Sequence, residues 1–575
     1  MRKSKFLSLM SDGSTDSAIV EEEIVYVRWC SKGVPTVTFV GLAAVQKADA
    51  SHIFDGIESL MTSTCASTCE KLEKLDWGEK LVAFGSDGAA VMTGKNNGVV
   101  AKIKSAHGAH IIGIHCMAHR LELSFKDALQ QNTCHRQLDD LLLGLYYFYH
   151  KSPLNRANLK KSYDALGMKP IMPTRVGGTR WVGHIRTALD HFLRGYPAIV
   201  QHLEQFLHSY IFNHIFQIQS PDAQGVRPEQ QAKSRKFYKV ATSFEVIQYA
   251  CFLLDVLQQL NNLSLTLQRK TITIAEVAKS LQVTRAVIEK YKDRDGSMLQ
   301  KLNKKPELEG VPLTKSGNST SFQASRRKLL DGLLASLDRR FDDVDAGLLK
   351  SSAIVDFSVW PHKDSSKDFG DDCLDDLTEH FKAVLESAHV DTTQVTDEWT
   401  SLKTTIYNHP DWQTTLKDIT WAEVNRRWGK GHDNILAVVD MVLTFPASTA
   451  ECERGFNVMK MIKSDWRSAL NNTSINDLMC VLLESSTITD FNPQRAIQLW
   501  LKSGIRRKRP EMCDSHASSY PVPIWKKQED EDLFEDELEE EEGEESDSEF
   551  LSDHLLVGLP ACHDDFPCEE LDRDA

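Results

Sequence analysis

The chain has 575 residues, 41% of them hydrophobic and 26% charged, a composition typical of globular proteins that excludes a collagen-like or wholly disordered chain. At roughly 150 residues per domain, the length predicts three or four domains. The net charge of -15 is concentrated at one end. Residues 528–575 contain 22 acids and one base, which leaves 66 bases against 60 acids and a net charge of +6 for residues 1–527. The sequence therefore predicts a slightly basic body with an acidic tail.

Targeting signals and cysteine usage favour a reducing compartment. The 12 cysteines are scattered, unlike those of a secreted disulfide scaffold. The apolar run near Met1 is too short for a signal peptide, and no stretch approaches the roughly 18 apolar residues that a membrane helix needs, so we expect no membrane partner. A basic run fits a nuclear localisation signal or, alternatively, the solvated end of a last helix. It consists of Arg506, Arg507, Lys508 and Arg509.

The first 130 residues read as three strands followed by alternating helices and strands. The predicted strands span residues 5–10, 23–30, 35–42, 81–85 and 110–114. The predicted helices span residues 48–64, 97–105 and 119–129. Short connections between the first three strands indicate an antiparallel meander, so this part is predicted to be a mixed α/β domain with a central sheet.

From residue 138 to residue 428 the pattern is helical throughout. Residues 244–267 place apolar side chains on one stripe, and residues 274–291 and 326–341 behave similarly. Residues 306–325, rich in Gly, Ser and Thr, are expected to form a loop. After residue 509 we expect no ordered structure, and residues 530–549 form an acidic, low-complexity stretch that cannot bury enough apolar surface to fold alone. The sequence thus predicts a disordered acidic C-terminal tail.

Two acidic residues are placed where buried strands are expected to end. Asp12 follows the first predicted strand, and Asp87 follows the strand at residues 81–85. Acids at strand ends meet at one edge of a sheet, where their oxygens can hold a divalent cation. The alternative is that both residues simply begin turns, as Asp before Gly often does.

Two further motifs admit both a functional and a structural interpretation. The segment from His115 to His119 contains ligand-type residues, but no second pair at zinc-finger spacing lies nearby, which favours a structural role. Trp181 follows Arg180, and this pair can stack on an unpaired base and hold a phosphate. Trp181 can equally fill the core at the start of a helix.

Residues 445–456 carry the signals of a helix start, with Pro446 followed by capping residues and then by acids. Glu453 can complement the helix dipole there. From Phe456 to Leu482 the segment supplies more apolar side chains than one helix pair can cover. Packing on another domain or subunit is therefore expected.

Five motifs in this order resemble those of the hAT (hobo/Activator/Tam3) superfamily of DNA transposases and their domesticated descendants. Residues 446–456, followed by Arg467 and Leu470, are similar to the family's dimerisation motif. The other four lie at residues 12–16, 86–89, 116–119 and 179–181, which match the first-aspartate, second-aspartate, Cys-x-x-His and Arg-Trp motifs. The resemblance covers about residues 5–485.

The resemblance implies a ribonuclease H-like core interrupted by a large all-helical insertion. It divides the chain into the first part of the core (1–190), the insertion (191–432), a dimerisation region that completes the core (433–505), and the basic run with the acidic tail (506–575). It also implies a catalytic, metal-binding triad of Asp12, Asp87 and Glu453 that uses Mg²⁺ or Mn²⁺ to activate water and then a 3'-hydroxyl.

The same resemblance assigns nucleic-acid binding to Arg180 and Trp181, and a structural role to Cys116 and His119. The residues that it assigns to dimerisation are Pro446, Arg454, Phe456, Arg467, Leu470 and Leu478. We therefore expect a homodimer or a higher homo-oligomer, with DNA or chromatin proteins as further partners.

The segment before the first motif departs from the family pattern. Only eleven residues precede Asp12, and they hold no zinc-finger spacing of the kind that binds transposon ends. The expectation is a domesticated nuclear protein that dimerises and binds DNA or chromatin weakly, is not an active transposase, and needs no cofactor. The alternative is an active metal-dependent DNA transposase or nuclease that uses the Asp-Asp-Glu triad.

Overall fold

The computed structural model describes residues 4–16, 19–67, 77–130, 132–177, 180–216, 228–315, 319–409, 416, 419–485, 489–494 and 496–498. The chain divides into two compact units, Met1–Phe456 and Asn457–Ala575. No helix in the described ranges is both long and apolar enough to cross a membrane. The predicted localisation signal at residues 506–509 and the acidic tail lie outside the described residues.

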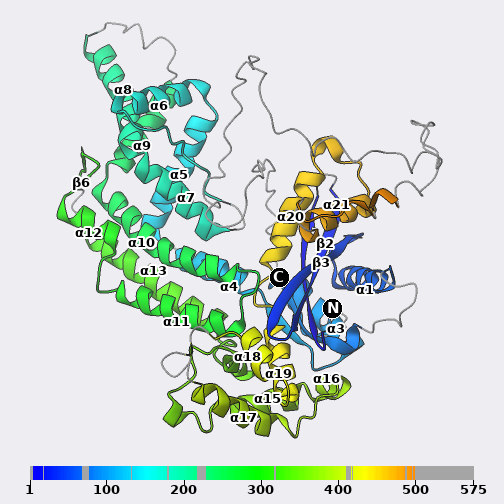
Figure 1. Cartoon of the computed structure of the whole chain (residues 1–575). Coiled ribbons are helices and arrows are strands. Elements are labelled where there is room, and N and C mark those ends of the chain that lie inside the picture. Colours follow the sequence, from blue (N-terminus) through cyan, green and yellow to red (C-terminus); the bar gives the residue numbers. More distant parts are fainter. Residues whose placement is uncertain are drawn as a thin grey trace, which may run out of the picture. The chain divides into compact units, whose positions relative to one another are not determined.

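The first unit contains a five-stranded mixed sheet in the order β3-β2-β1-β4-β5. Strands β2 and β3 of this sheet are labelled in Figure 1. Its strands are β1 (Leu7–Thr15), β2 (Glu21–Ser31), β3 (Val34–Val45), β4 (Leu81–Ser86) and β5 (Ile112–His115). The first three strands form an antiparallel meander, whereas β4 runs parallel to β1 and β5 parallel to β4. The predicted mixed α/β arrangement is therefore confirmed.

The predicted end of the first strand is wrong. Strand β1 continues through Asp12 to Thr15, because its last residues pair with the beginning of β2, with Asp12 opposite Ile24 and Thr15 opposite Glu21. An antiparallel partner supplies hydrogen bonds to residues that would otherwise favour a turn. Asp12 thus lies within a strand rather than after it.

Alternating side chains of the sheet enter two different cores. Leu7 and Leu9 pack with Val25 and Val27 in a cluster that includes side chains of α1 (Ala50–Ser67) and α3 (Val99–His107). Successive strand residues point to opposite faces, and the other face packs against α19 (Asp433–Leu443). Helix α4 (Met117–Leu129) follows β5 directly and adds its apolar side chains to the larger core.

The predicted helical region is confirmed as a long series of helices between α4 and the last part of the unit (Figure 1). They are α5 (Thr133–His150), α6 (Pro153–Leu166), α7 (Trp181–Arg194), α8 (Tyr196–Phe216), α9 (Pro228–Ala241), α10 (Phe244–Leu267), α11 (Ile274–Lys290), α12 (Ser297–Lys304), α13 (Ser319–Arg340), α14 (Gly347–Lys350), α15 (Asp371–His380), α16 (Lys382–Ser387), α17 (Val395–Asn408) and α18 (Trp421–Trp428). Helix α10 has the predicted bounds, and it is largely buried.

One predicted loop in this region is partly wrong. Residues 306–325 contain a two-stranded hairpin, β6 (Glu307–Leu308) and β7 (Val311–Pro312), and the first turns of α13. The hairpin turn contains Glu309 and Gly310, both with positive φ. The abundance of Gly and Ser indicated the turn, but local composition does not reveal that α13 packs along α4 and extends its N-terminal end into this segment.

A buried arginine joins the sheet to segments far along the chain. The Arg28 side chain is 1% exposed, and its guanidinium donates to the backbone carbonyls of Leu443, Lys270 and Thr271. Burial lowers the pKa of Arg28 to about 10. At the β2–β3 turn, the Asp440 carboxylate accepts from the backbone N–H of Gly33 at 2.7 Å. These contacts hold the end of α19 against the sheet.

Helix α20 (Ala450–Ile462) begins in the first unit, and its last residues belong to the second. In the second unit it is followed by a short 3-10 helix, Asp465–Arg467, and by α21 (Asn472–Glu484). The side chain of Asn471 accepts from the backbone N–H of Ser474 at 2.8 Å and so caps α21. The predicted helical character of this segment is confirmed.

Candidate functional site

Asp12 and Asp87 lie near each other on two neighbouring parallel strands, Asp12 within β1 and Asp87 directly after β4. Met10 of β1 is paired with Gly85 of β4, and each aspartate lies two residues further along its strand's direction. The carboxylate of Asp12 accepts from the backbone N–H of Gly13, and that of Asp87 accepts from Ala89, as in an Asx turn. The turn interpretation of Asp87 and the convergence of both acids at one sheet edge are therefore compatible.

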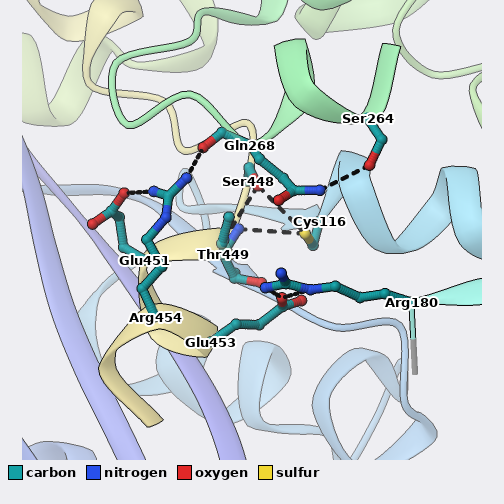
Figure 2. A network of polar contacts seen from close by, with 10 residues as sticks. Cys116, Arg180, Ser264, Gln268, Ser448, Thr449, Glu451, Glu453 and Arg454 are labelled. Carbon is teal, nitrogen blue, oxygen red and sulfur yellow. Dashed lines mark hydrogen bonds and ion pairs between the residues drawn. The ribbon is translucent and has the colours of Figure 1, made fainter. Parts of the chain in front are cut away.

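Glu453 is brought to this edge by the segment that precedes α20. The N–H of Met117 donates to the carbonyl of Ala447 at 3.0 Å, and the Cys116 thiol sulfur accepts from the backbone N–H of Thr449 at 3.3 Å (Figure 2). Cys116 itself donates its N–H to the Ser86 carbonyl, next to Asp87. The buried Cys116 thus links the end of β4 to the start of α20.

Two glycines allow this approach. A Cβ atom on Gly85 would lie 3.0 Å from the ring of Pro446, and one on Gly455 would lie 2.3 Å from Ile24 and 2.6 Å from the hydroxyl of Tyr26. Gly455 therefore lets α20 approach strand β2 closely. Because Glu453 is only two residues earlier, this contact also keeps its backbone near the sheet.

The three predicted acids influence one another electrostatically. The pKa of Asp12 is raised to about 7, mainly by burial, with the negative charges of Asp87 and Glu453 contributing. A carboxyl group in this position resists ionisation unless a cation balances the cluster. The structure thus brings the predicted triad to one place, and its catalytic role stays a prediction.

A fourth acid, Glu23, was not found from the sequence. Its side chain is 1% exposed, it lies opposite Gly13 in the β1–β2 ladder, and its carboxyl group contacts the Ser11 hydroxyl. Burial is the main cause that raises its pKa to about 8, with Asp12 and Asp87 contributing. In the sequence, Glu23 is only an acid within a predicted strand. It lies beside Asp12 because β1 continues past Asp12 and pairs with this part of β2.

Arg180 and Trp181 form the beginning of α7, beside the acid cluster. Arg180 precedes the helix, and its Nε donates to Glu453 Oε2 at 2.6 Å, with a second contact from Nη2 (Figure 2). Trp181 is half-buried, and the ammonium group of Lys126 lies 4.2 Å from the centre of its ring. Trp181 therefore packs against the main core while part of its ring stays accessible.

Glu122 is a second residue that the sequence did not reveal. It is 7% exposed on α4, and its carboxylate accepts from the backbone N–H of Val182 at 2.9 Å, at the positive end of α7. Burial raises the pKa of Glu122 to about 7. This contact fixes the start of α7, and with it the Arg180–Trp181 pair.

The histidines of the Cys-x-x-His segment do not form a metal site in the described part of the chain. His115 packs over Gly88, and its ring centre lies 5.6 Å from that of His119, which is half-buried. Burial, together with the charge of Arg120, lowers the pKa of His115 to about 3, so His115 is neutral at physiological pH.

The acid cluster also fails as a three-ligand metal site in the form described. Among the described residues, no group of three or more His, Cys, Asp or Glu side chains is placed to hold a metal ion. Carboxylate oxygens are suitable ligands for Mg²⁺ or Mn²⁺, but an oxygen of Glu453 is already bound by Arg180. The arrangement therefore does not fit a cation shared by all three acids.

The residues predicted for dimerisation fall into two groups. In the first unit Pro446 packs beside Gly85, Phe456 is 6% exposed, and Arg454 pairs with Glu451 while donating to the Gln268 carbonyl at 2.6 Å (Figure 2). In the second unit the side chains are more accessible: Arg467 is exposed, Leu470 is half-buried, and Leu478 is 42% exposed. Dimerisation itself stays a prediction.

No protein-family model matches the sequence.

Proposed function

We propose that the chain is a hAT transposase-derived nuclear protein that dimerises through the second unit and binds DNA or chromatin weakly, without acting as a transposase. The observation that carries the proposal is the set of large apolar side chains left in solvent there. They are Trp466 (98% exposed), Leu478 (42%), Val481 (61%) and Leu482 (59%). Clustered exposed apolar side chains are typical of protein interaction surfaces.

The spacing on α21 supports a helix-to-helix interface. Leu478, Val481 and Leu482 recur at intervals of three and four residues, which places them on one face of the helix. A second copy of this chain offers the same face, as a two-fold interface requires. The dimerisation motif of the hAT resemblance covers the same segment, and it favours this occupant over another protein.

The sheet supports the proposed ancestry. Three antiparallel strands followed by two parallel ones, in the order β3-β2-β1-β4-β5, are compatible with a ribonuclease H-like core. The helices between α4 and α19 then correspond to the insertion, and α20 returns an acid to the sheet edge. We include this core in the proposal.

Weak DNA binding is supported by the start of α7. Trp181 has a half-buried aromatic ring with Lys126 and Arg180 as neighbouring cations, a combination suited to a stacked base and a phosphate. We expect DNA to bind weakly because a base would have to displace Lys126 from the Trp181 ring, and a phosphate would have to displace Glu453 from Arg180.

Light scattering of the full chain at micromolar concentration tests the dimer. We expect the wild type to have twice the monomer mass and Leu482→Asp to be monomeric, since a buried charge opposes the interface. Leu154→Asp is the matched control, because Leu154 is an equally exposed leucine (57%) on α6. A monomeric wild type, or equal dissociation by both substitutions, contradicts the proposal.

The convergence of Asp12, Asp87 and Glu453 favours a second candidate, an active metal-dependent DNA transposase or nuclease. The purified chain is incubated with supercoiled DNA and Mn²⁺, and nicking is followed on a gel. Nicking that Asp87→Ala abolishes supports this second candidate and contradicts the first. Intact DNA with both proteins supports the first.

A further inference from the structure

A polar cavity of about 510 Å³ lies beside the end of β5, between α4 and the end of α13. Its lining consists of three arginines, three aspartates and one histidine. The histidine, His115, is the last residue of β5 and pairs with Ser86 of the parallel strand β4. The cavity therefore lies at the carboxyl end of these two strands, the place where open α/β sheets commonly bind ligands.

Arg120 brings a buried donor to this cavity. The residue is 6% exposed, and its two Nη atoms contact the Asp343 carboxylate and the carbonyl of Arg340. Its Nε is buried and has no hydrogen-bond partner among the described residues, and the same holds for Nε2 of His115. Buried polar groups nearly always have a partner, because burial removes their hydrogen bonds to water. These two atoms therefore indicate a place for a bound polar group.

The other two arginines of the lining share a single carboxylate oxygen. Oδ2 of Asp127 accepts from Arg339 Nη2 at 2.7 Å, from Arg340 Nε at 2.9 Å and from the hydroxyl of Ser336 at 2.9 Å. Within the described ranges, Nη1 of Arg340 makes no hydrogen bond. Because each guanidinium carries five N–H groups, the lining offers more donors than its own carboxylates accept.

The electrostatics around His115 favours an anion, although the arginines and aspartates of the lining are equal in number. Burial is the main cause that lowers the pKa of His115 to about 3, the charges of Arg120 and Arg340 lower it further, and Asp343 acts in the opposite direction. Asp342 is exposed, so solvent screens its charge. Positive charge thus outweighs negative charge at the histidine.

We propose that this cavity binds a phosphate group, either as inorganic phosphate or as the monoester of a small molecule. A phosphate monoester presents three terminal oxygens, which guanidinium groups bind in charge-assisted pairs. Arg120, Arg339 and Arg340 supply these groups, and neutral His115 can donate or accept one more hydrogen bond. The volume is that of a small-molecule pocket, so there is room for the organic part of a monoester. The proposal is independent of the dimer and of the DNA binding proposed above.

Ligand-observed nuclear magnetic resonance of the full chain at constant ionic strength tests the site with three probes. Inorganic phosphate should bind with a dissociation constant on the order of 1 mM or lower, which a few charge-assisted hydrogen bonds can supply. AMP should bind at least as tightly, because it carries the same group. Adenosine, which lacks the phosphate, should not bind. Tighter binding of AMP than of inorganic phosphate would identify a monoester as the ligand, and equal binding would identify free phosphate.

Substitutions at the cavity locate the bound phosphate. Arg340→Gln should weaken phosphate binding about tenfold, because one guanidinium is lost while Arg339 still pairs with Asp127. Arg327→Gln is the matched control. It removes the same charge from an exposed arginine of α13 that lies 13 positions (340 minus 327) from Arg340, about 20 Å along the helix and beyond the screening length, so the change should stay below about twofold. Asp342→Asn removes an acid of the lining and should tighten phosphate binding about threefold.

Absence of inorganic phosphate binding up to about 20 mM overturns the proposal. Equal affinities of the wild type and Arg340→Gln also overturn it, as does an equal loss in Arg327→Gln. Circular dichroism checks that each variant is folded. Should Arg340→Gln not fold, Arg339→Gln replaces it, because that side chain is 66% exposed, and the expected loss is about threefold. Weaker binding to Asp342→Asn would contradict an anion site, since an ion-pair network that only joins α4 to α13 gives no reason for a gain in phosphate affinity.

Discussion

Helix α20 up to Phe456 buries its apolar side chains, whereas the segment from Trp466 to Leu482 buries some, such as Ile475 and Met479, and exposes others. In the first unit Cys452 is fully buried, Phe456 is 6% exposed, and Gly455 leaves no room beside β2. In the second unit Trp466 is 98% exposed and Val481 61%. In this segment the first part completes a core within the chain, and the second leaves several apolar side chains exposed.

The largest expected change in stability comes from adding a side chain at Gly455, where α20 packs against β2. Gly455→Val should lower the free energy of unfolding by about 3 kcal/mol, because its side chain would overlap Ile24 and Tyr26. Urea denaturation of the full chain measures it. The control is Gly183→Val on α7, where no atom lies within 4 Å of the added Cβ. Equal losses for both variants would contradict the close packing of α20 on the sheet.

The buried carboxyl group of Glu23 on β2 should make the stability of the protein depend on pH. The pKa of Glu23 is raised from 4.5 to about 8, mainly by burial, so the native state retains a proton that the unfolded chain releases. Stability from this group is therefore full below pH 4.5 and declines as the pH rises towards 8. Glu23→Gln should consequently gain on the order of 3 kcal/mol relative to wild type between pH 5 and pH 8.

Urea denaturation at pH 5 and at pH 8 gives this difference. The control is Glu309→Gln, which alters an exposed glutamate in the β6–β7 turn and should shift stability equally at both pH values. A pH-independent effect of Glu23→Gln would show that Glu23 is not held in its protonated form.

A smaller effect is expected at the contact between Cys116 and the start of α20. Cys116→Ala should cost about 1–2 kcal/mol in unfolding free energy, because the buried N–H of Thr449 loses its acceptor. Cys116→Ser should recover part of this loss, since a hydroxyl oxygen can accept from the same N–H. If alanine and serine behave alike, the hydrogen bond does not contribute.

The smallest change in stability is expected for the exposed apolar side chains of α21. Val481→Ser should change the unfolding free energy by less than about 0.5 kcal/mol when the protein is dilute enough to be monomeric, because the valine is 61% exposed. At higher concentration the same substitution should weaken self-association. A loss above about 1 kcal/mol in the dilute sample would mean that Val481 contributes to the fold of its own chain.

The elements could largely be predicted from the sequence, because their signals are local. The stripe of apolar residues in α10 and the Lys32–Gly33 turn, with φ values of 53° and 77°, need no knowledge of distant segments. The approach of Asp12 to Asp87 was also predictable, since both follow buried strand patterns. The resemblance to a known family, rather than the pattern, placed Glu453 with them.

The remainder of the site depends on tertiary contacts. The extension of β1 requires β2 as a partner, and only that extension places Glu23 beside Asp12. Likewise, Glu122 is an ordinary acid in a helical pattern until its carboxylate meets the first turn of α7. The Arg180–Glu453 pair joins residues whose local sequences contain no sign of each other.

The hydrogen bond from Arg28 to Leu443 can form only after most of the chain has been synthesised. The two residues are separated by 415 positions. At a translation rate of about 5–20 residues per second, Leu443 is synthesised roughly 20 to 80 s after Arg28. During that interval one face of the meander lacks α19, and the apolar side chains on that face have no helix to cover them. This layer of the core can therefore be completed only late in synthesis.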